Sequence, residues 1–365
     1  MPVSELYVGL MSGTSLDGID AVLVDFSSGQ PAMLANKLLD FTPELKQELT
    51  VLQAASPDEL GRTAQAANAL ARRYSIAVTD VLHEAGVTSS QVAAIGMHGQ
   101  TIRHRPELGY TLQIGNAALL AELSGICVVS DFRSRDVAAG GQGAPLVPAF
   151  HQGVFGGAVH RAVVNIGGIA NITDLPANGL VRGWDTGPGN VLMDCWTSRY
   201  QGRAYDAGGQ WASTGHVSPL LLQAMLSDPY FTALPPKSTG RDLFHIDWLD
   251  RMVGNVELPQ EDVQATLLEL TARSIVDAVL NHAPNAHEVY ICGGGARNTA
   301  LMRRLGDLLA PRTLAGTDTL GLHPDWVEAV AFAWLARQCL KGLPGNLPAV
   351  TGARGPRVLG AIHPA

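Results

Sequence analysis

Apolar and polar positions alternate along this chain in a way that predicts an α/β fold. Several apolar runs are too short for helices and are bounded by glycine or polar residues, as buried strands are. In the first part of the chain, such runs lie at residues 6–11, 19–24, 92–97 and 126–130. Segments of helical composition are expected between and around them at residues 43–60, 61–85 and 117–123.

The second part of the chain begins in the same way. Residues 138–145 are rich in Gly and Ala, and we expect a flexible domain boundary there. A strand, a glycine turn and a second strand follow over residues 162–173. A strand that leads through a glycine loop into a helix is expected over residues 289–309, and a further helix over 327–340.

The loop between the first two strands has the composition of a phosphate-binding turn. Its glycines let a ligand approach the backbone, and successive N–H groups in such a loop form an anion-binding concavity. Hydroxyl groups are added by Ser12, Thr14 and Ser15. Asp17 and Asp20 are candidates to hold a hydrated Mg²⁺, which favours oxygen ligands. An ordinary Ser/Gly hairpin has the same composition, and the loop matches neither common glycine-rich nucleotide motif.

Two further glycine elements strengthen the phosphate hypothesis. The hairpin at residues 162–173 resembles the first in form, which suggests a duplicated architecture with a cleft between two domains, although coincidence is the alternative. The loop Gly293–Gly295 opens a helix. Glycines there let a flat group or a phosphate lie against the backbone, and a helix N-terminus favours anions.

Composition narrows the classes of function. A chain of 365 residues is expected to form two domains. The formal net charge of −8 argues against sequence-independent nucleic-acid binding. No apolar stretch reaches the roughly 18 residues that span a bilayer, so no membrane partner is expected. The four cysteines are widely spaced and the N-terminus does not resemble a signal peptide, which favours a cytoplasmic protein with reduced thiols.

The three glycine elements, in this order, resemble those of the superfamily of sugar kinases, heat-shock-protein-70 chaperones and actin. That resemblance implies a two-domain actin-like ATPase fold, related to ribonuclease H, with an interdomain cleft. The whole motif set resembles the anhydro-N-acetylmuramic acid kinases over essentially the full chain. The motifs that carry this closer resemblance lie at residues 9–20, 97–104, 131–136, 165–173 and 184–190.

The closer resemblance implies an activity. Members of that family use ATP and water to convert 1,6-anhydro-N-acetylmuramic acid into N-acetylmuramic acid 6-phosphate in cell-wall recycling, and some pair as homodimers. It further implies ATP and Mg²⁺ as cofactors and a C-terminal segment that returns to the first domain. The expected domains are residues 1–143 with 345–365, and residues 144–344.

Two other functions stay open at this point. A simple amino-sugar kinase of the N-acetylglucosamine type would use the same fold to phosphorylate a sugar hydroxyl. A nucleotide-driven chaperone or filament-forming ATPase is the second alternative, but no partner-binding insertion is visible in the sequence. One departure from the superfamily pattern concerns the metal. Met11 stands where the first hairpin usually carries an aspartate, so the carboxylate that orients Mg²⁺ is undecided between Asp17 and Asp20.

Two carboxylates are candidates for catalysis. Asp185 precedes a rigid Gly/Pro loop and is the candidate base that activates water, the role that the resemblance also implies, whereas an Asx turn is the structural alternative. Glu328 is either a second carboxylate near that water or an acid that complements the dipole of the helix it opens.

The remaining candidates bind ligands. Arg133 can pair with the lactyl carboxylate or with phosphate, or else with Asp131 or Asp136 in a solvated loop, and His98 supports its loop rather than acting as a base. The expected sugar-binding residues are His98, Gln100, Thr101, Arg133, Gly187, Gly189 and Asn190. The expected nucleotide-binding residues are Gly13, Thr14, Ser15, Leu16, Asp17, Gly18, Ile19, Asp20, Asn165, Gly167, Gly168, Asn171, Gly293, Gly294, Gly295 and Asn298.

Overall fold

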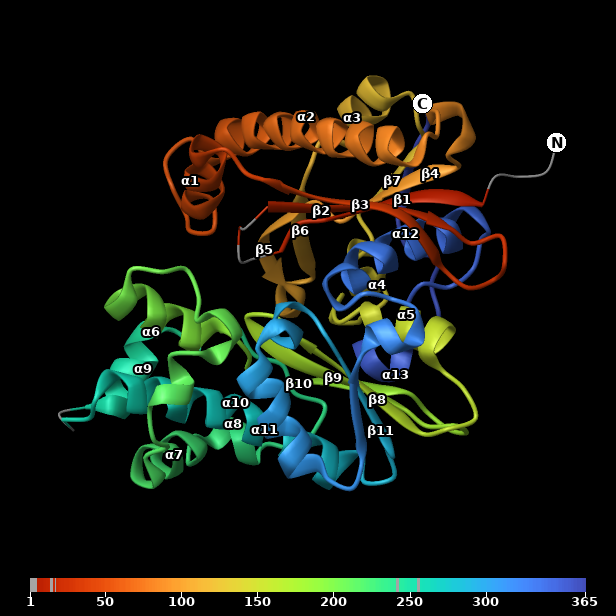
Figure 1. The fold of residues 1–365 in the computed structure, drawn as a ribbon. Coiled ribbons are helices and arrows are strands. Elements are labelled where there is room, and N and C mark those ends of the chain that lie inside the picture. The colour runs from red at the N-terminus through yellow and green to blue at the C-terminus, as the bar shows by residue number, and fades with distance from the viewer. Residues whose placement is uncertain (1–4, 14–15, 17, 241–242, 255–256) are drawn as a thin grey trace. The chain divides into compact units, whose positions relative to one another are not determined.

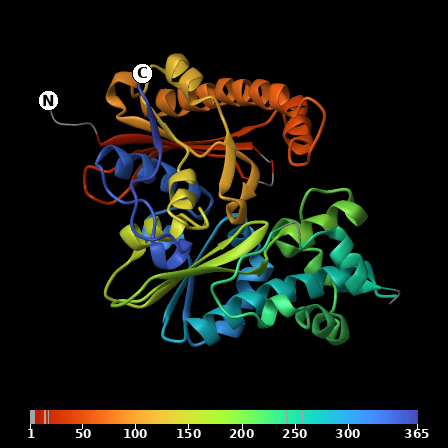
Figure 2. The same ribbon diagram turned by 180° about the vertical axis from the view of Figure 1, so that it is seen from behind.

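The computed structural model describes residues 5–13, 16, 18–240, 243–254 and 257–365. It divides into two compact units, which are shown in Figures 1 and 2. Unit 1 comprises residues 1–154 and 326–365, and unit 2 comprises residues 155–325. The first boundary lies after residue 154, later than the expected 143/144. The second lies after residue 325, earlier than the expected 344/345.

Local packing explains why unit 1 extends beyond the expected boundaries. Helix α5 (Val147–Phe155) packs against helix α12 (Val327–Leu340), where the ring centres of Phe150 and Trp334 lie 6.0 Å apart with an interplanar angle of 68°. Helix α12 in turn packs against the sheet of unit 1. Its apolar face therefore belongs to the core of the first unit.

Unit 1 is built on a six-stranded sheet with the strand order β13-β7-β4-β1-β2-β3. Helices α2 and α3 lie on one face of this sheet and α12 lies on the other (Figure 1). Its strands are β1 (Leu6–Met11), β2 (Gly18–Asp25), β3 (Ala32–Asp40), β4 (Ala94–Met97), β7 (Val128–Ser130) and β13 (Ala361–His363), and β5 (Gln100–Arg105) pairs with β6 (Tyr110–Ile114) in a separate ribbon. Its other helices are α1 (Pro43–Val51), α2 (Glu59–Ala85), α3 (Ala117–Ser124), α4 (Ser134–Ala138) and α13 (Pro348–Thr351).

The first hairpin forms as predicted. Strands β1 and β2 are antiparallel, with Met11 opposite Asp20 at the end of the pair, and β1 is parallel to β4. Strand β3, which the apolar pattern did not reveal, pairs with β2 along its whole length. The two helices expected at 43–60 and 61–85 are also confirmed in kind, but the first ends at Val51 and the second begins at Glu59.

Two glycines let helix α12 approach the sheet closely. A Cβ atom on Gly9 would overlap the carbonyl oxygen of Ala329, and one on Gly96 would overlap that of Phe332. Both glycines lie on the neighbouring strands β1 and β4. The absence of their side chains therefore sets the distance between α12 and the sheet.

Replacing Gly9 with alanine is expected to lower the free energy of unfolding by about 1–3 kcal/mol, because the added methyl group must displace the backbone of α12. Chemical denaturation monitored by circular dichroism measures this change. Gly306→Ala is the matched control. A Cβ there meets only Leu314 Cδ2, at 3.8 Å, in a helix where alanine is favoured, so its stability should be equal or higher. Equal stability of both variants would contradict the close-packing account.

Unit 2 repeats the topology of unit 1. Its five-stranded sheet has the order β10-β9-β8-β11-β12, in which the first two pairings are antiparallel and the last two are parallel. Its strands are β8 (Arg161–Ile166), β9 (Ile169–Leu175), β10 (Arg182–Pro188), β11 (Glu288–Cys292) and β12 (Thr313–Gly316). Its helices are α6 (Val191–Gln201), α7 (Pro219–Leu226), α8 (Pro229–Thr232), α9 (Ile246–Val253), α10 (Gln260–His282) and α11 (Thr299–Leu309).

The shared strand order supports the predicted duplication. In unit 1 the order β3-β2-β1-β4-β7 joins a three-stranded antiparallel meander to two parallel strands, and unit 2 has the same arrangement. The core of unit 2 lies between this sheet and the helices around α10, and it contains Val164, Ile172 and Trp184. The α/β class and the ribonuclease-H-like strand order are thus confirmed in each unit.

Candidate functional site

The first hairpin carries part of the predicted nucleotide site. Gly13 accepts hydrogen bonds from the side chain of Gln100, at 3.1 Å, and from the backbone N–H of Leu16, at 3.2 Å. Leu16 and Ile19 are buried, Gly18 begins β2, and Asp20 is half-buried at the end of the strand pair. Thr14, Ser15 and Asp17 lie outside the described residues.

Two side chains expected to face a ligand also support this hairpin. The Ser12 hydroxyl donates to the carbonyl of Gly99 at 3.0 Å and shares a hydrogen bond with the Tyr74 hydroxyl at 2.8 Å. Gln100 is fully buried with its amide nitrogen on the carbonyl of Gly13, while its Oε1 has no hydrogen-bond partner among the described residues. Ser12 and Gln100 therefore help to fix the loop between β1 and β2. Sequence composition could not reveal these contacts, because Tyr74 and Gly99 are distant from Ser12 in the chain.

The buried His98 and the half-buried Arg133 form a pair in unit 1. The Arg133 guanidinium donates to His98 Nε2 at 2.9 Å and to the carbonyl of Gly143 at 2.8 Å. Because arginine has only donors, Nε2 must accept and the imidazole is neutral. Burial, with the nearby Arg133 charge, lowers the pKa of His98 to about 3. This arrangement favours the expected supporting role for His98.

Glu328, in the first turn of α12, is close enough for its charge to act on the same guanidinium. Burial raises the pKa of Glu328, and the positive charge of Arg133 opposes that rise. Burial in turn lowers the pKa of Arg133 to about 10, against the negative charges of Glu328 and Asp136. Asp136 itself is saturated by Asn346, Thr351 and the N–H of Gly143, and Asp131 caps Ser134. Arg133 is therefore directed to His98 and Gly143 rather than into an ion pair with either aspartate.

A polar pocket of about 570 Å³ lies beside this pair in unit 1. His98 is one of its lining residues, together with Asn116 at the start of α3 and Gln113 on β6. Gln113 donates to the Thr101 hydroxyl at 3.2 Å, so the predicted residue Thr101 is held by a neighbour that sequence reasoning missed. Gln113 follows the alternating pattern of a strand, and that pattern alone does not single it out.

The second hairpin and the glycine loop meet at one end of the unit 2 sheet. The N–H groups of Gly189 and Asn190 donate to the carbonyls of Gly168 and Gly167, at 2.9 and 2.8 Å. The Asn190 side chain donates to the carbonyl of Ile166 at 3.2 Å. Gly189 and Asn190, expected to bind sugar, are thus brought against the turn expected to bind phosphate.

The glycine loop completes this backbone-lined surface. Gly293 has a φ of +79°, which disfavours any side chain, and a Cβ there would overlap the Asn165 side chain. Gly294 and Gly167 are more open, since a Cβ on either would meet no other atom closer than 3.6 Å. Asn298 caps α11 by accepting the N–H of Leu301 at 3.0 Å, so its side chain has a structural use.

Asp185 lies in a polar row across the same sheet. On β10 it is paired with Asn171 of β9, which is paired with Asn165 of β8. Residues directly opposite each other on paired strands lie on one face, and the neighbouring row of Trp184, Ile172 and Val164 belongs to the core. Asp185, Asn171 and Asn165 therefore share the face opposite that core. A β-bulge follows Asp185 before Gly187, a feature that redirects side chains.

The carboxylate of Asp185 is held in a partly dry environment. Its Oδ2 accepts the backbone N–H of Thr239 at 3.0 Å. Burial raises the pKa of Asp185 to about 6, although the hydrogen bond from Thr239 opposes this rise. A carboxylate with such a pKa is a better base than an exposed one and is still mostly ionised at neutral pH. Thr239 was not among the residues predicted from the sequence.

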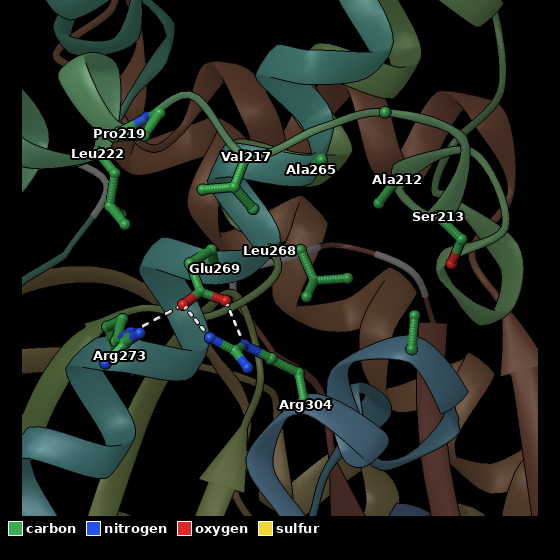
Figure 3. A pocket seen from close by; sticks show the side chains of 12 residues that line it. Ala212, Ser213, Val217, Pro219, Leu222, Ala265, Leu268, Glu269, Arg273 and Arg304 are labelled. Atoms are coloured by element: carbon green, nitrogen blue, oxygen red, sulfur yellow. Dashed lines mark hydrogen bonds and ion pairs between the residues drawn. The ribbon is translucent and has the colours of Figure 1, made fainter. Parts of the chain in front are cut away.

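A second pocket lies elsewhere in unit 2 and contains none of the predicted residues. It has a volume of about 410 Å³ and is lined by Leu268, Glu269 and Arg304 among others (Figure 3). Glu269 accepts from Arg304 at 2.6 and 2.7 Å and from Arg273 at 2.7 Å. Burial would raise the pKa of Glu269, but these hydrogen bonds hold it below its usual range. The carboxylate of Glu269 is therefore fully paired, while the two arginines leave this pocket with a net positive charge.

Two absences concern only the described part of the chain. No group of three or more His, Cys, Asp or Glu side chains is arranged there to hold a metal ion. No helix in the described ranges is long and apolar enough to cross a membrane.

The repeated strand order and the glycine turns at the strand ends define a class of protein. Each unit has the ribonuclease-H-like order, and two such units in one chain are the arrangement of the actin-like ATPases. The family model described as anhydro-N-acetylmuramic acid kinase matches residues 5–365. The chain belongs to that family.

Curated relatives are similar to this chain over nearly their full length. A protein from Thiobacillus denitrificans named anhydro-N-acetylmuramic acid kinase is 57% identical, over 99% of this chain and 98% of the relative. Proteins of the same name from Nitrosospira multiformis and Pseudomonas putida are 55% and 52% identical, over 98% and 99% of this chain and 99% of each relative.

Solved structures are more distant. An activator of 2-hydroxyisocaproyl-CoA dehydratase from Clostridium difficile has a TM-score of 0.46 and 13% identity, over 92% of this chain and 96% of that chain. A glucokinase of the ROK family from Streptomyces griseus has a TM-score of 0.42 and 15% identity, over 91% of this chain and 99% of that chain. The strand order, not these likenesses, defines the fold.

Proposed function

We propose that this protein is an ATP-dependent kinase that opens the 1,6-anhydro ring of 1,6-anhydro-N-acetylmuramic acid with water and phosphorylates O6. The products are N-acetylmuramic acid 6-phosphate and ADP, and the role is cell-wall recycling. The observation that carries this proposal is the full-length similarity to curated relatives of that printed name, at 52–57% identity. The position and environment of Asp185 support the chemistry.

Asp185 is the proposed base. It takes a proton from water as the water oxygen forms a bond to C1 of the sugar. The C1–O6 bond breaks, and its electron pair stays on O6, which attacks the γ-phosphorus of ATP while ADP departs. O6 therefore needs no separate acid, unlike the leaving group of an ordinary glycosidase. The raised pKa of Asp185, about 6, suits this task near neutral pH.

The proposed nucleotide groups are mostly backbone. Gly167 and Gly294 have open space beside their main chain in unit 2, and Gly168 of unit 2 and Gly13 of unit 1 likewise carry no side chain. Such backbone suits the phosphates of ATP. Mg²⁺, when bound, would neutralise charge that develops on the phosphates. The carboxylate of Asp20 is a hard oxygen donor that fits a hydrated Mg²⁺, and Asp17, outside the described residues, is the other candidate.

Unit 1 supplies the proposed sugar-binding charges. Arg133 is held by His98 and Gly143 in a fixed orientation, which favours recognition of the lactyl carboxylate. Glu328 is the proposed second carboxylate, because its half-buried position and raised pKa exceed what dipole complementation of a helix needs.

A substrate comparison tests the function. Purified protein with ATP and Mg²⁺ should form ADP and a sugar phosphate from 1,6-anhydro-N-acetylmuramic acid, and should leave N-acetylglucosamine unchanged. Phosphorylation of N-acetylglucosamine with no reaction of the anhydro sugar would assign the chain to simple amino-sugar kinases. ATP hydrolysis without either sugar product would favour a nucleotide-driven conformational protein.

A further inference from the structure

Helix α8 and the segment that follows it hold Asp185 in place. The Tyr230 hydroxyl donates to the carbonyl of Asp185 at 2.8 Å, and the backbone N–H of Asp185 donates to the carbonyl of Lys237 at 3.0 Å. The Lys237 ammonium links the two ends of this region, because it donates to the carbonyl of Tyr230 at 2.9 Å. It also lies 4.5 Å from the centre of the Tyr230 ring. Asp185 is therefore fixed through its backbone at a bulge in the edge strand β10.

Thr239 lies at the end of this segment and contacts the carboxylate itself. Its N–H donates to Asp185 Oδ2 at 3.0 Å. Its hydroxyl oxygen is buried and has no hydrogen-bond partner among the described residues. A buried hydroxyl without a partner loses its hydrogen bonds to water on folding, which is costly unless a ligand or ordered water restores them. Thr239 thus has one group committed to Asp185 and one group available beside it.

The carboxylate has a matching free position. Oδ2 is occupied by Thr239, whereas Oδ1 accepts no hydrogen bond from the residues the structure describes. A water molecule that donates one proton to Asp185 Oδ1 and the other to Thr239 Oγ1 has a lone pair left for attack. Two fixed acceptors orient such a water better than a single carboxylate does.

We propose that Thr239 binds the attacking water with its hydroxyl while its N–H fixes the carboxylate of Asp185. This inference rests on the proposed function and adds a residue to the reacting site. In the step, the water oxygen forms a bond to C1, its proton passes to Asp185 Oδ1, and the C1–O6 electron pair leaves with O6. Thr239 gains and loses no covalent bond. It contributes orientation only.

Thr239→Val is the decisive variant, because valine keeps the backbone N–H and the shape but removes the hydroxyl. We expect kcat to fall about tenfold, as for the loss of one hydrogen bond to the reacting water. The KM for the sugar should change little. The pH midpoint of kcat/KM should stay near that of the wild type, because the N–H that faces Asp185 is retained and Tyr230 and Lys237 are untouched. A merely structural defect would shift that midpoint or lower the melting temperature.

Two further variants complete the test. Thr239→Ser restores a hydroxyl and should recover most of the wild-type kcat, whereas Thr232→Val alters an exposed threonine of α8 and should leave kcat unchanged. Wild-type kcat in Thr239→Val, or equal loss in the valine and serine variants, would overturn the proposal. An inactive wild type would instead overturn the proposed function, so the two failures are distinguishable.

Discussion

Asp185→Asn is expected to lower the turnover of 1,6-anhydro-N-acetylmuramic acid by about 10²–10⁴-fold, the usual contribution of a positioned general base. The amide keeps an oxygen that can accept the N–H of Thr239, but it cannot take a proton from water. Steady-state kinetics with the purified variant measures the loss. Binding of ATP should be retained, because Asp185 is not among the proposed nucleotide groups.

The pH dependence supplies an internal control. In the wild type, kcat/KM should rise as pH increases through about 6, where Asp185 becomes ionised. The pKa of Asp185 is higher in the folded protein than its usual value of 3.8, so the folded state binds more protons between these values. The Asp185 contribution to stability is therefore fully present below about pH 4 and is lost as pH rises through about 6.

Asp185→Asn removes that titration. At about pH 7.5, above the pKa of Asp185, the melting temperature of the variant should therefore equal or exceed that of the wild type. A variant that keeps wild-type turnover would contradict the role of Asp185. A variant that loses both turnover and stability would mean that Asp185 is chiefly structural.

Arg133→Met is expected to raise the KM for the sugar roughly 10–100-fold, the scale of one lost hydrogen bond to a charged group. Methionine fills much of the same volume but cannot pair with a carboxylate. The variant also loses the hydrogen bonds to His98 and Gly143, so stability must be measured beside the kinetics. With an analogue that lacks the lactyl carboxylate, the KM values of the wild type and the variant should differ little.

Arg135→Met is the matched control: Arg135 lies in helix α4, and Arg133 is the residue directly before that helix. Arg135 is exposed, whereas Arg133 is half-buried. The control should keep both KM and kcat. Equal effects of the two substitutions would indicate a general loss of positive charge and would contradict a specific role for Arg133.

The elements that could be predicted are those with local signals. The hairpin of β1 and β2, that of β8 and β9, and the loop Gly293–Gly295 combine apolar runs with glycine turns, and all three formed as expected. The helix at 327–340 was also confirmed: its long apolar run, with buried residues from Val327 to Cys339, is that of a helix buried on most sides. The duplication followed from recognising two similar hairpins.

What the sequence did not reveal depends on partners that are distant in the chain. Strand β3 is largely exposed at the edge of its sheet, and its apolar signal is correspondingly weak. Ser12 and Gln100 have the residue types of ligand-binding groups, and the sequence did not reveal their contacts with Tyr74, Gly99 and Gly13. Thr239 is hydrogen-bonded to Asp185 although the two residues are 54 positions apart in the sequence. No spacing rule links such residues, so only the fold brings them together.

The central claim is that one protein couples hydrolysis of the anhydro bond to phosphorylation of O6. The most direct measurement is mass spectrometry of the product formed from ATP, Mg²⁺ and 1,6-anhydro-N-acetylmuramic acid in ¹⁸O-labelled water. We predict a single product that carries the label at C1 and an unlabelled phosphate on O6. A phosphorylated sugar without label at C1, or labelled phosphate released with the anhydro ring intact, would contradict the account.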